Sequence, residues 1–211
     1  MKIWLFTLFV VAVLFGCKNK PEVGLPYFND ADFTPVWLDK DDPAYKKLHV
    51  VPSFALTDQN SHVVSEKTAI GKICIVNFFF TRCENICPRM MDNMKKAANA
   101  FATDTSVLII SHSVTPFYDN VAVLQKYARD KNITANNWHL VTGNKDQIYS
   151  LARKGYFADN VTGPAVNSQF LHTENFILVD RNRHIRGVYN GTIELEVDNL
   201  IRHIKMLEQE E

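Results

Sequence analysis

One short stretch of the chain joins a buried strand, two cysteines and a helix with almost no residues between them. The run Ile73–Phe80 is strongly apolar, as expected of a central strand that is covered on both faces. Cys83 and Cys87 follow at once, and apolar residues then recur at helical spacing from Met90 to Phe101. The two thiols are therefore predicted at a strand-to-helix turn, on the N-terminal end of a helix, where partial positive charge favours thiolates.

The spacing of this cysteine pair limits the functions that it can have. A thiolate is both the nucleophile of disulfide exchange and a soft metal ligand, so Cys83 and Cys87 indicate redox chemistry, copper or zinc binding, or both. A plain stabilising disulfide is the alternative, but a gap of three residues closes a tiny loop and removes little unfolded-state entropy. Cys74 lies between the strand residues Ile73 and Ile75, and we expect it to be a buried apolar filler.

The N-terminus has the pattern of a secretory signal. A lysine at position 2 precedes an almost unbroken apolar run from Ile3 to Phe15, which is too short for a comfortable membrane span. The run Leu14–Cys17 resembles a bacterial lipobox, in which the cysteine is lipidated and becomes the new N-terminus. An uncleaved anchor helix is the alternative. Both predict a cell-envelope protein, and a lipid anchor at Cys17 would hold the domain at a membrane, facing the periplasm.

The remaining chain divides into a tether and one domain. Residues 18–47 are predicted to be a tether, whose aromatic side chains indicate that part of it packs on the domain. Residues 48–211 are expected to form one domain, and residues 1–17 the lipoprotein signal peptide. The 23 basic and 23 acidic residues give a formal net charge of zero with no basic stripe, so a nucleic-acid partner is not expected.

The order of predicted elements indicates an α/β fold. A hairpin comes first, then three strands alternate with three helices, and a second hairpin and a final helix end the chain. Such alternation predicts a central mixed β-sheet flanked by helices, with a parallel core and the N-terminal β-hairpin at its margin. A cysteine pair after the first long central strand is the layout of a thioredoxin-like fold, although thioredoxin has two residues between its cysteines and this chain has three.

Motifs across the domain resemble the Sco/SenC family, whose members help to assemble cytochrome c oxidase. The similarity lies in an entry hairpin, a strand with a C-x-x-x-C-P motif, an S-V-x-P turn, a W-x-x-x-T-G strand, a histidine motif before a strand and the end of the second hairpin. The matching segments are residues 54–59, 77–88, 113–116, 138–143, 171–180 and 189–191.

The resemblance implies a copper chaperone. In this family two thiolates and one histidine bind a single copper ion, and the matching positions here are Cys83, Cys87 and His172. Copper(I) prefers thiolates and accepts three ligands, while the imidazole would make copper(II) tolerable. The implied partner is subunit II of cytochrome c oxidase, which holds the CuA centre, or another periplasmic copper or thiol protein. Thr115 stands where the family usually has aspartate, and Glu84-Asn85-Ile86 also departs from its pattern.

Other functions use the same residues. A periplasmic thiol–disulfide oxidoreductase would need Cys83 and Cys87 but not His172, with Cys83 as the expected attacking thiol. A peroxiredoxin-type peroxidase fits poorly, because Thr81 is two rather than three residues before Cys83. A zinc site could use the same ligands, yet no general base is evident nearby. Apart from thiol–disulfide exchange, the chain is not expected to be an enzyme.

Several other residues are candidates for a site or for the core. His112 precedes the S-V-x-P turn and is a candidate for a role near the cysteines. Met90, Met91 and Met94 could be copper-binding thioethers, but their helical spacing favours core packing. Asp180, just before a tight turn, is expected to cap backbone amides.

Overall fold

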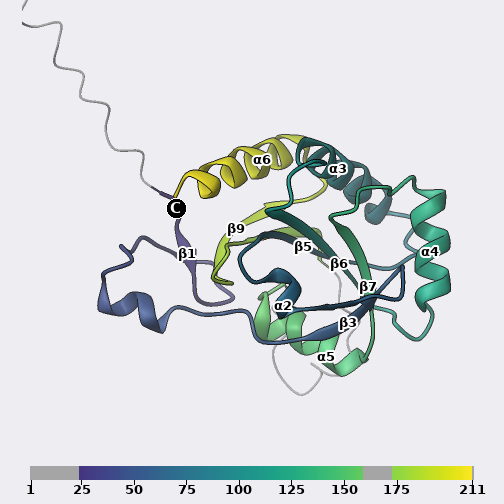
Figure 1. Ribbon diagram of the computed structural model, residues 1–211, viewed down its shortest axis with the longest axis horizontal. Coiled ribbons are helices and arrows are strands. Elements are labelled where there is room, and N and C mark those ends of the chain that lie inside the picture. Colours follow the sequence, from purple (N-terminus) through teal and green to yellow (C-terminus); the bar gives the residue numbers. More distant parts are fainter. Residues whose placement is uncertain (1–23, 159–172, 211) are drawn as a thin grey trace, which may run out of the picture.

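A mixed sheet of nine strands forms the centre of the molecule. The computed structural model describes residues 24–158 and 173–210, and the strands lie in the order β2-β1-β9-β8-β5-β6-β7-β3-β4. Figure 1 shows the helices arranged around this sheet. The predicted central mixed sheet flanked by helices is therefore confirmed.

Three parallel strands make the core of the sheet. β5 (Ile73–Phe79) pairs in parallel with β6 (Val107–Ser113), which pairs in parallel with β7 (Trp138–Thr142). Every residue of β5 and β6 is buried, which explains why β5 is apolar except for Asn77 and why the first four residues of β6 are all apolar. Because parallel strands have their C-terminal ends on the same side of the sheet, the segments that follow β5 and β6 lie next to each other there.

Antiparallel hairpins flank this core on both sides, as predicted. On one side, β8 (Asn175–Val179) pairs with β5 and β9 (Ile185–Asn190). On the other side, β3 (Ala55–Asp58) pairs with β7 and β4 (Val63–Ser65). Asp180 accepts hydrogen bonds from the amides of Asn182 and His184, so its predicted role in the turn of the β8–β9 hairpin is confirmed.

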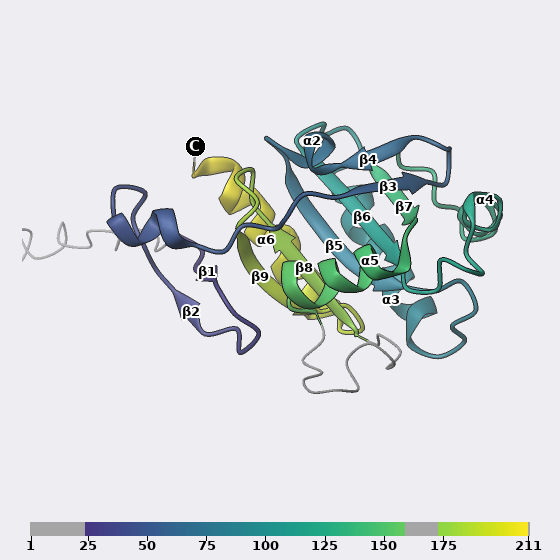
Figure 2. The same ribbon diagram turned by 90° about the horizontal axis from the view of Figure 1, so that it is seen from below.

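Helices cover the two faces of the sheet. Residues of α3 (Ile86–Ala100), α4 (Val121–Asp130) and α6 (Glu194–Gln209) pack on the face that carries Ile73, Ile75 and Phe79. The short α2 (Glu66–Ala69) and the run of α5 (Lys145–Ser150) and η2 (Leu151–Gly155) cover the opposite face, as Figure 2 shows for α5. Met90, Met91 and Met94 are fully buried in α3, which confirms core packing for them.

The N-terminal segment from Gly24 to Lys47 joins the sheet. β1 (Tyr27–Phe28) pairs with β9 and with β2 (Pro35–Val36), and the helical turn η1 (Pro43–Lys47) follows. The sequence predicted that part of this segment packs on the domain, and the strands show which part. We call residues 24–28 the N-terminal arm.

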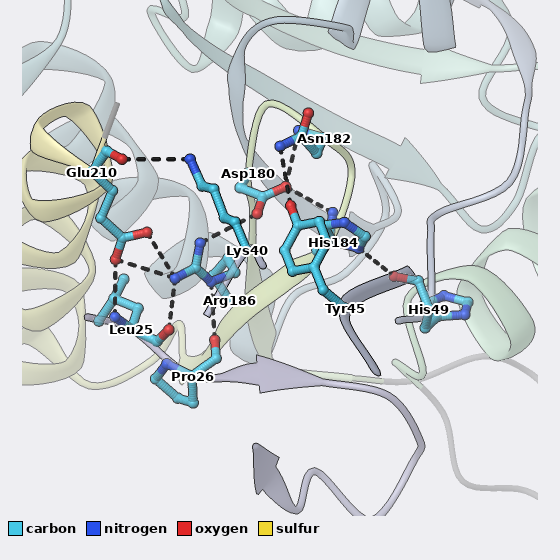
Figure 3. A network of polar contacts seen from close by, with 10 residues as sticks. All are labelled: Leu25, Pro26, Lys40, Tyr45, His49, Asp180, Asn182, His184, Arg186 and Glu210. Atoms are coloured by element: carbon cyan, nitrogen blue, oxygen red, sulfur yellow. Dashed lines mark hydrogen bonds and ion pairs between the residues drawn. The ribbon is translucent and has the colours of Figure 1, made fainter. Parts of the chain in front are cut away.

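A buried arginine holds the N-terminal arm in place (Figure 3). The Arg186 guanidinium donates to the carbonyl oxygens of Leu25 at 2.6 Å and Pro26 at 3.1 Å. It also pairs with Glu210 at 2.8 Å and Asp180 at 3.3 Å. In the β8–β9 register, Leu178 lies opposite Gly187 and Val179 opposite Ile185, which leaves Arg186 as the extra residue of a bulge. A bulge redirects a side chain, and here it accompanies the turn of Arg186 towards the arm.

Candidate metal centre

The two cysteines lie between the end of β5 and the first turn of α3. Cys83 is in the connecting turn, where its amide donates to the carbonyl oxygen of Phe80 at 3.2 Å, and it is partly exposed. Cys87 is the second residue of α3 and is buried. The Cys87 amide donates to the Cys83 sulfur at 3.4 Å, and both cysteines are free thiols. The predicted position of the pair is therefore confirmed.

The Cys83 sulfur takes the place of a helix cap. The N-cap residue of α3, Asn85, makes no side-chain capping hydrogen bond, so the first amides of the helix point to the thiol instead. Burial alone raises the pKa of Cys83. Hydrogen bonds from the Cys87 thiol and from the amides of residues 85–87 outweigh this effect, so the pKa of Cys83 lies below its ordinary value.

Cys87 has the opposite character. Burial raises the pKa of the Cys87 thiol, and donation of its proton to Cys83 raises the pKa further. The pair therefore combines the partly exposed Cys83, which loses its proton more easily than an ordinary thiol, with the buried Cys87, which keeps its proton more strongly. This difference suits stepwise disulfide exchange, and it also suits a soft metal that enters through Cys83 first.

A buried carboxylate that the sequence did not single out supports the cysteine turn. Asp119 is fully buried and accepts hydrogen bonds from the amide and hydroxyl of Thr81. It also accepts from the hydroxyls of Ser113 at 2.6 Å and Thr115 at 2.9 Å. Thr115, which replaces the aspartate usual in the family turn, is therefore one of several donors to Asp119. The only sequence signal was its place three residues after the S-V-T-P turn.

The third predicted ligand, His172, lies outside the described residues. Its successor Thr173 and the next residue, Glu174, lead into β8, whose start is at the sheet edge where β5 ends, because the two strands are antiparallel. Glu174 is fixed there, since its carbonyl oxygen accepts from the Gly191 amide at 2.7 Å. Within residues 24–158 and 173–210, no three histidine, cysteine or acidic side chains are grouped to hold a metal. The Cys-Cys-His set stays a prediction.

His112 lies on the other face of the sheet from Cys87. Its ring stacks on Phe78 at 5.1 Å and packs near Phe54 and Tyr156, whereas Cys87 packs with the α3 face. Burial lowers the pKa of His112 to about 3, so the ring is neutral. Strand alternation places it there, because Leu108, Ile110 and His112 share one face of β6.

Cys74 and two further histidines have contacts that fit roles in the structure of the domain. Cys74 is buried and its pKa is raised to about 12 by burial, which confirms it as a core residue. His139 bonds to Asp58 at 2.9 Å, and His203 bonds to the Tyr189 hydroxyl at 2.7 Å. Cys17, the predicted lipidation site, lies outside the described residues.

Comparisons with known proteins identify the family. A family model for SCO1/SenC matches residues 42–208. The chain belongs to the SCO1/SenC family. One SCO1/SenC relative, the SCO1 protein homolog of Bacillus subtilis (strain 168), is 31% identical over 157 residues, which cover 74% of this chain and 81% of the relative.

Solved SCO1/SenC structures share the fold. A SCO1/SenC family lipoprotein from Bacillus anthracis str. Ames superposes with a TM-score of 0.67 at 26% identity, covering 76% of this chain and 95% of the other. BsSco, a Sco-family cytochrome c oxidase assembly protein in which a disulfide switch has been identified, gives 0.66 at 28% identity, covering 77% and 95%. Bradyrhizobium japonicum ScoI, solved with copper bound, gives 0.57 at 24% identity, covering 73% and 99%. The predicted thioredoxin-like fold is therefore confirmed.

Across residues 24–158 and 173–210, none of the helices is both long enough and apolar enough to cross a bilayer.

Proposed function

We propose that this protein is a membrane-tethered copper chaperone that delivers copper to the CuA centre of cytochrome c oxidase subunit II, or to another periplasmic copper or thiol protein. Cys83, Cys87 and His172 bind the copper, and a lipid on Cys17 holds the protein at a membrane of the cell envelope. The observation that carries the proposal is the free thiol pair at the start of α3, where a helix amide already points to the Cys83 sulfur at 3.4 Å.

The chemistry of this thiol pair fits copper(I) as cargo. Two soft sulfur donors within one helical turn suit copper(I), and a third ligand from the loop before β8 would complete a three-coordinate site. Cys83 is partly exposed, so an acceptor can reach the ion there and exchange ligands. Bradyrhizobium japonicum ScoI, solved with copper bound, supports the same cargo, and the oxidase-assembly role of BsSco supports the same target.

A thiol–disulfide oxidoreductase is the second candidate. The opposite pKa shifts of the two thiols favour it, because the lower-pKa, partly exposed Cys83 would attack a target disulfide and the buried Cys87 would then resolve the mixed disulfide. This function needs reduced thiols and no metal. The two functions are separated by their dependence on His172.

Anaerobic copper(I) titration of the reduced full chain in detergent tests the proposal. A competing chelator sets the affinity, and the His172→Ala variant is compared with His62→Ala, because His62 is well exposed on the β3–β4 turn. We expect tight one-to-one binding that weakens at least about tenfold in His172→Ala and is unchanged in His62→Ala. Weak binding, or binding that ignores His172, would leave the oxidoreductase as the better account.

A further inference from the structure

An aromatic pair projects from the loop that follows β6. Phe117 is 87% exposed and Tyr118 is 51% exposed. A side chain as large and apolar as phenylalanine gains nothing from such exposure in an isolated protein, and aromatic residues of this kind supply much of the energy of protein interfaces. Because β5 and β6 are parallel and adjacent, this loop lies at the same sheet edge as the turn that contains Cys83.

The loop is held rigidly against the cysteine turn. Asp119 accepts hydrogen bonds from Thr81, two residues before Cys83, and from Ser113 and Thr115 on the loop side. The amides of Tyr118 and Asp119 both donate to the Thr115 carbonyl oxygen at 2.9 Å. The loop that carries Phe117 and Tyr118 is therefore preorganised, and a partner that binds there would need to order it little further.

A second contact fixes the aromatic pair beside Cys83. The guanidinium of Arg82, the residue next to Cys83, lies over the Tyr118 ring at 4.4 Å from its centroid. Cation–π contacts of this kind stabilise one relative position of the two groups. The Phe117 and Tyr118 rings are themselves in edge contact, with centroids 5.3 Å apart, so Phe117, Tyr118 and Arg82 form one surface that continues directly in the chain to Cys83. We call these three residues the aromatic rim.

We propose that the aromatic rim is the docking surface for the copper-accepting protein. The partner is a folded domain that carries its copper ligands, thiols or imidazoles, within an apolar patch that packs on Phe117. This inference rests on the proposed chaperone function and adds the surface that positions the acceptor. In the transfer step, the bonds from copper(I) to Cys83, Cys87 and His172 break as bonds to the acceptor ligands form, and the His172 imidazole leaves as the neutral ring. The acceptor thiols release their protons, the two cysteines regain theirs, and no electron moves.

The position of the N-terminal arm favours a protein rather than the membrane as the occupant. The arm leads to the predicted lipid anchor, and Leu25 is bound to Arg186 and Glu210 (Figure 3). Ile73, the first residue of β5, lines the same small cavity as Arg186 and Glu210. The arm therefore leaves the domain near the start of β5, about 20 Å along the seven-residue strand from the end that carries the aromatic rim. A tether at that end leaves the aromatic rim on the part of the domain that lies far from the point of attachment.

Copper transfer from two acceptors tests this surface. The full chain in detergent, loaded with copper(I), is mixed with the reduced apo CuA domain of an oxidase subunit II or, separately, with a small copper(I) chelator. Trp37→Ser is the matched control for Phe117→Ser, because Trp37 is 54% exposed and follows β2 at the far edge of the sheet. We expect Phe117→Ser to slow transfer to the protein by about tenfold, with transfer to the chelator and the Trp37→Ser rates unchanged.

The outcomes separate the two proposals. A wild-type chain that does not load copper would overturn the chaperone function itself. A chain that loads and transfers copper at the same rate with or without Phe117 would overturn the docking surface alone. A photo-crosslinking phenylalanine analogue at position 117, in membranes with the acceptor present, identifies the occupant directly. Crosslinks to the acceptor support the proposal, whereas crosslinks only to lipid or to a second copy of this chain would overturn it.

Discussion

At the scale of single residues, Asp119 determines the shape of the cysteine turn. Its carboxylate accepts hydrogen bonds from residues at the end of β5, at the end of β6 and in the loop after it. Two segments that are about 35 residues apart in sequence are therefore bound to one side chain. A buried carboxylate is stable only when its oxygens are hydrogen-bonded, and Asp119 meets this condition with four donors. Sequence patterns could not reveal this role, because the donors come together only in the folded chain.

Replacing Asp119 by alanine should destabilise the protein. Asp119→Ala leaves the Thr81 amide and three hydroxyls without their acceptor, and we expect the free energy of unfolding to fall by about 2–4 kcal/mol. Asp119→Asn should cost less, since an amide oxygen can still accept part of these bonds. Urea unfolding measures both, with Asp92→Ala as the control, because Asp92 is exposed and its ion-pair partner among the described residues is Lys95. Equal losses in Asp119→Ala and Asp92→Ala would contradict the role of the buried carboxylate.

At the scale of elements, the sequence predicted the long strands and helices well but missed the shortest ones. The runs that became β5 and β6 are buried on both faces, so their apolar character shows at once in the sequence. β1 and β2 have two residues each, too few for any periodic pattern. Their place in the sheet depends on Arg186, about 160 residues away, so local sequence could indicate that the segment packs but not where.

For the candidate site, too, the features that depend on local sequence were predicted, and those that depend on tertiary contacts were not. Cys83 and Cys87 were predicted because a strand, a turn and a helix follow one another directly in sequence. The face on which His112 lies follows from strand alternation, yet its stacking on Phe78 depends on the pairing of β5 with β6. The exposed Phe117 has no sequence signal, because exposure depends on which neighbouring segments cover a residue.

Replacing Arg186 should release the N-terminal arm. Arg186→Met leaves the carboxylates of Asp180 and Glu210 without their positively charged partner, and breaking such a largely buried pair costs about 3–5 kcal/mol of unfolding free energy. Hydrogen exchange should accelerate at the Leu25 amide, which donates to Glu210 at 3.0 Å. Arg202→Met, at an exposed position on α6, should change neither quantity. Unchanged exchange in the arm would show that Arg186 does not hold it.

At the scale of the whole molecule, one buried histidine links the stability of the fold to pH. Neither ring nitrogen of His112 has a hydrogen-bond partner within the described part of the chain, and the ring is fully buried among aromatic residues. The folded protein therefore contains His112 with its imidazole ring in the neutral form. The unfolded chain binds a proton at His112 below pH about 6.5, whereas the folded chain does so only near pH 3.

The sign of the resulting pH dependence is fixed by this difference. As pH falls from about 6.5 towards 3, the unfolded state binds a proton at His112 and the folded state does not. The free energy of unfolding should therefore fall by up to about 1.4 kcal/mol per pH unit. His112→Leu should reduce this slope and should be at least as stable as the wild type at pH 8, since it removes two unpaired buried nitrogens. Denaturant unfolding at several pH values measures both; parallel pH profiles would contradict the assignment.

The fixed N-terminal arm also limits how far the proposed copper site could move from its membrane anchor. A free tether over residues 18–47 would let the domain sweep a wide volume, but the arm is bound from Leu25 onward. With Cys17 lipidated, only the six residues from Lys18 to Val23 separate the lipid from Gly24, and an extended chain of that length reaches at most about 25 Å. Such a short connection would confine the protein to a thin layer next to the bilayer. The effective concentration that an acceptor in the same membrane meets would thereby rise without any additional contact between the two proteins.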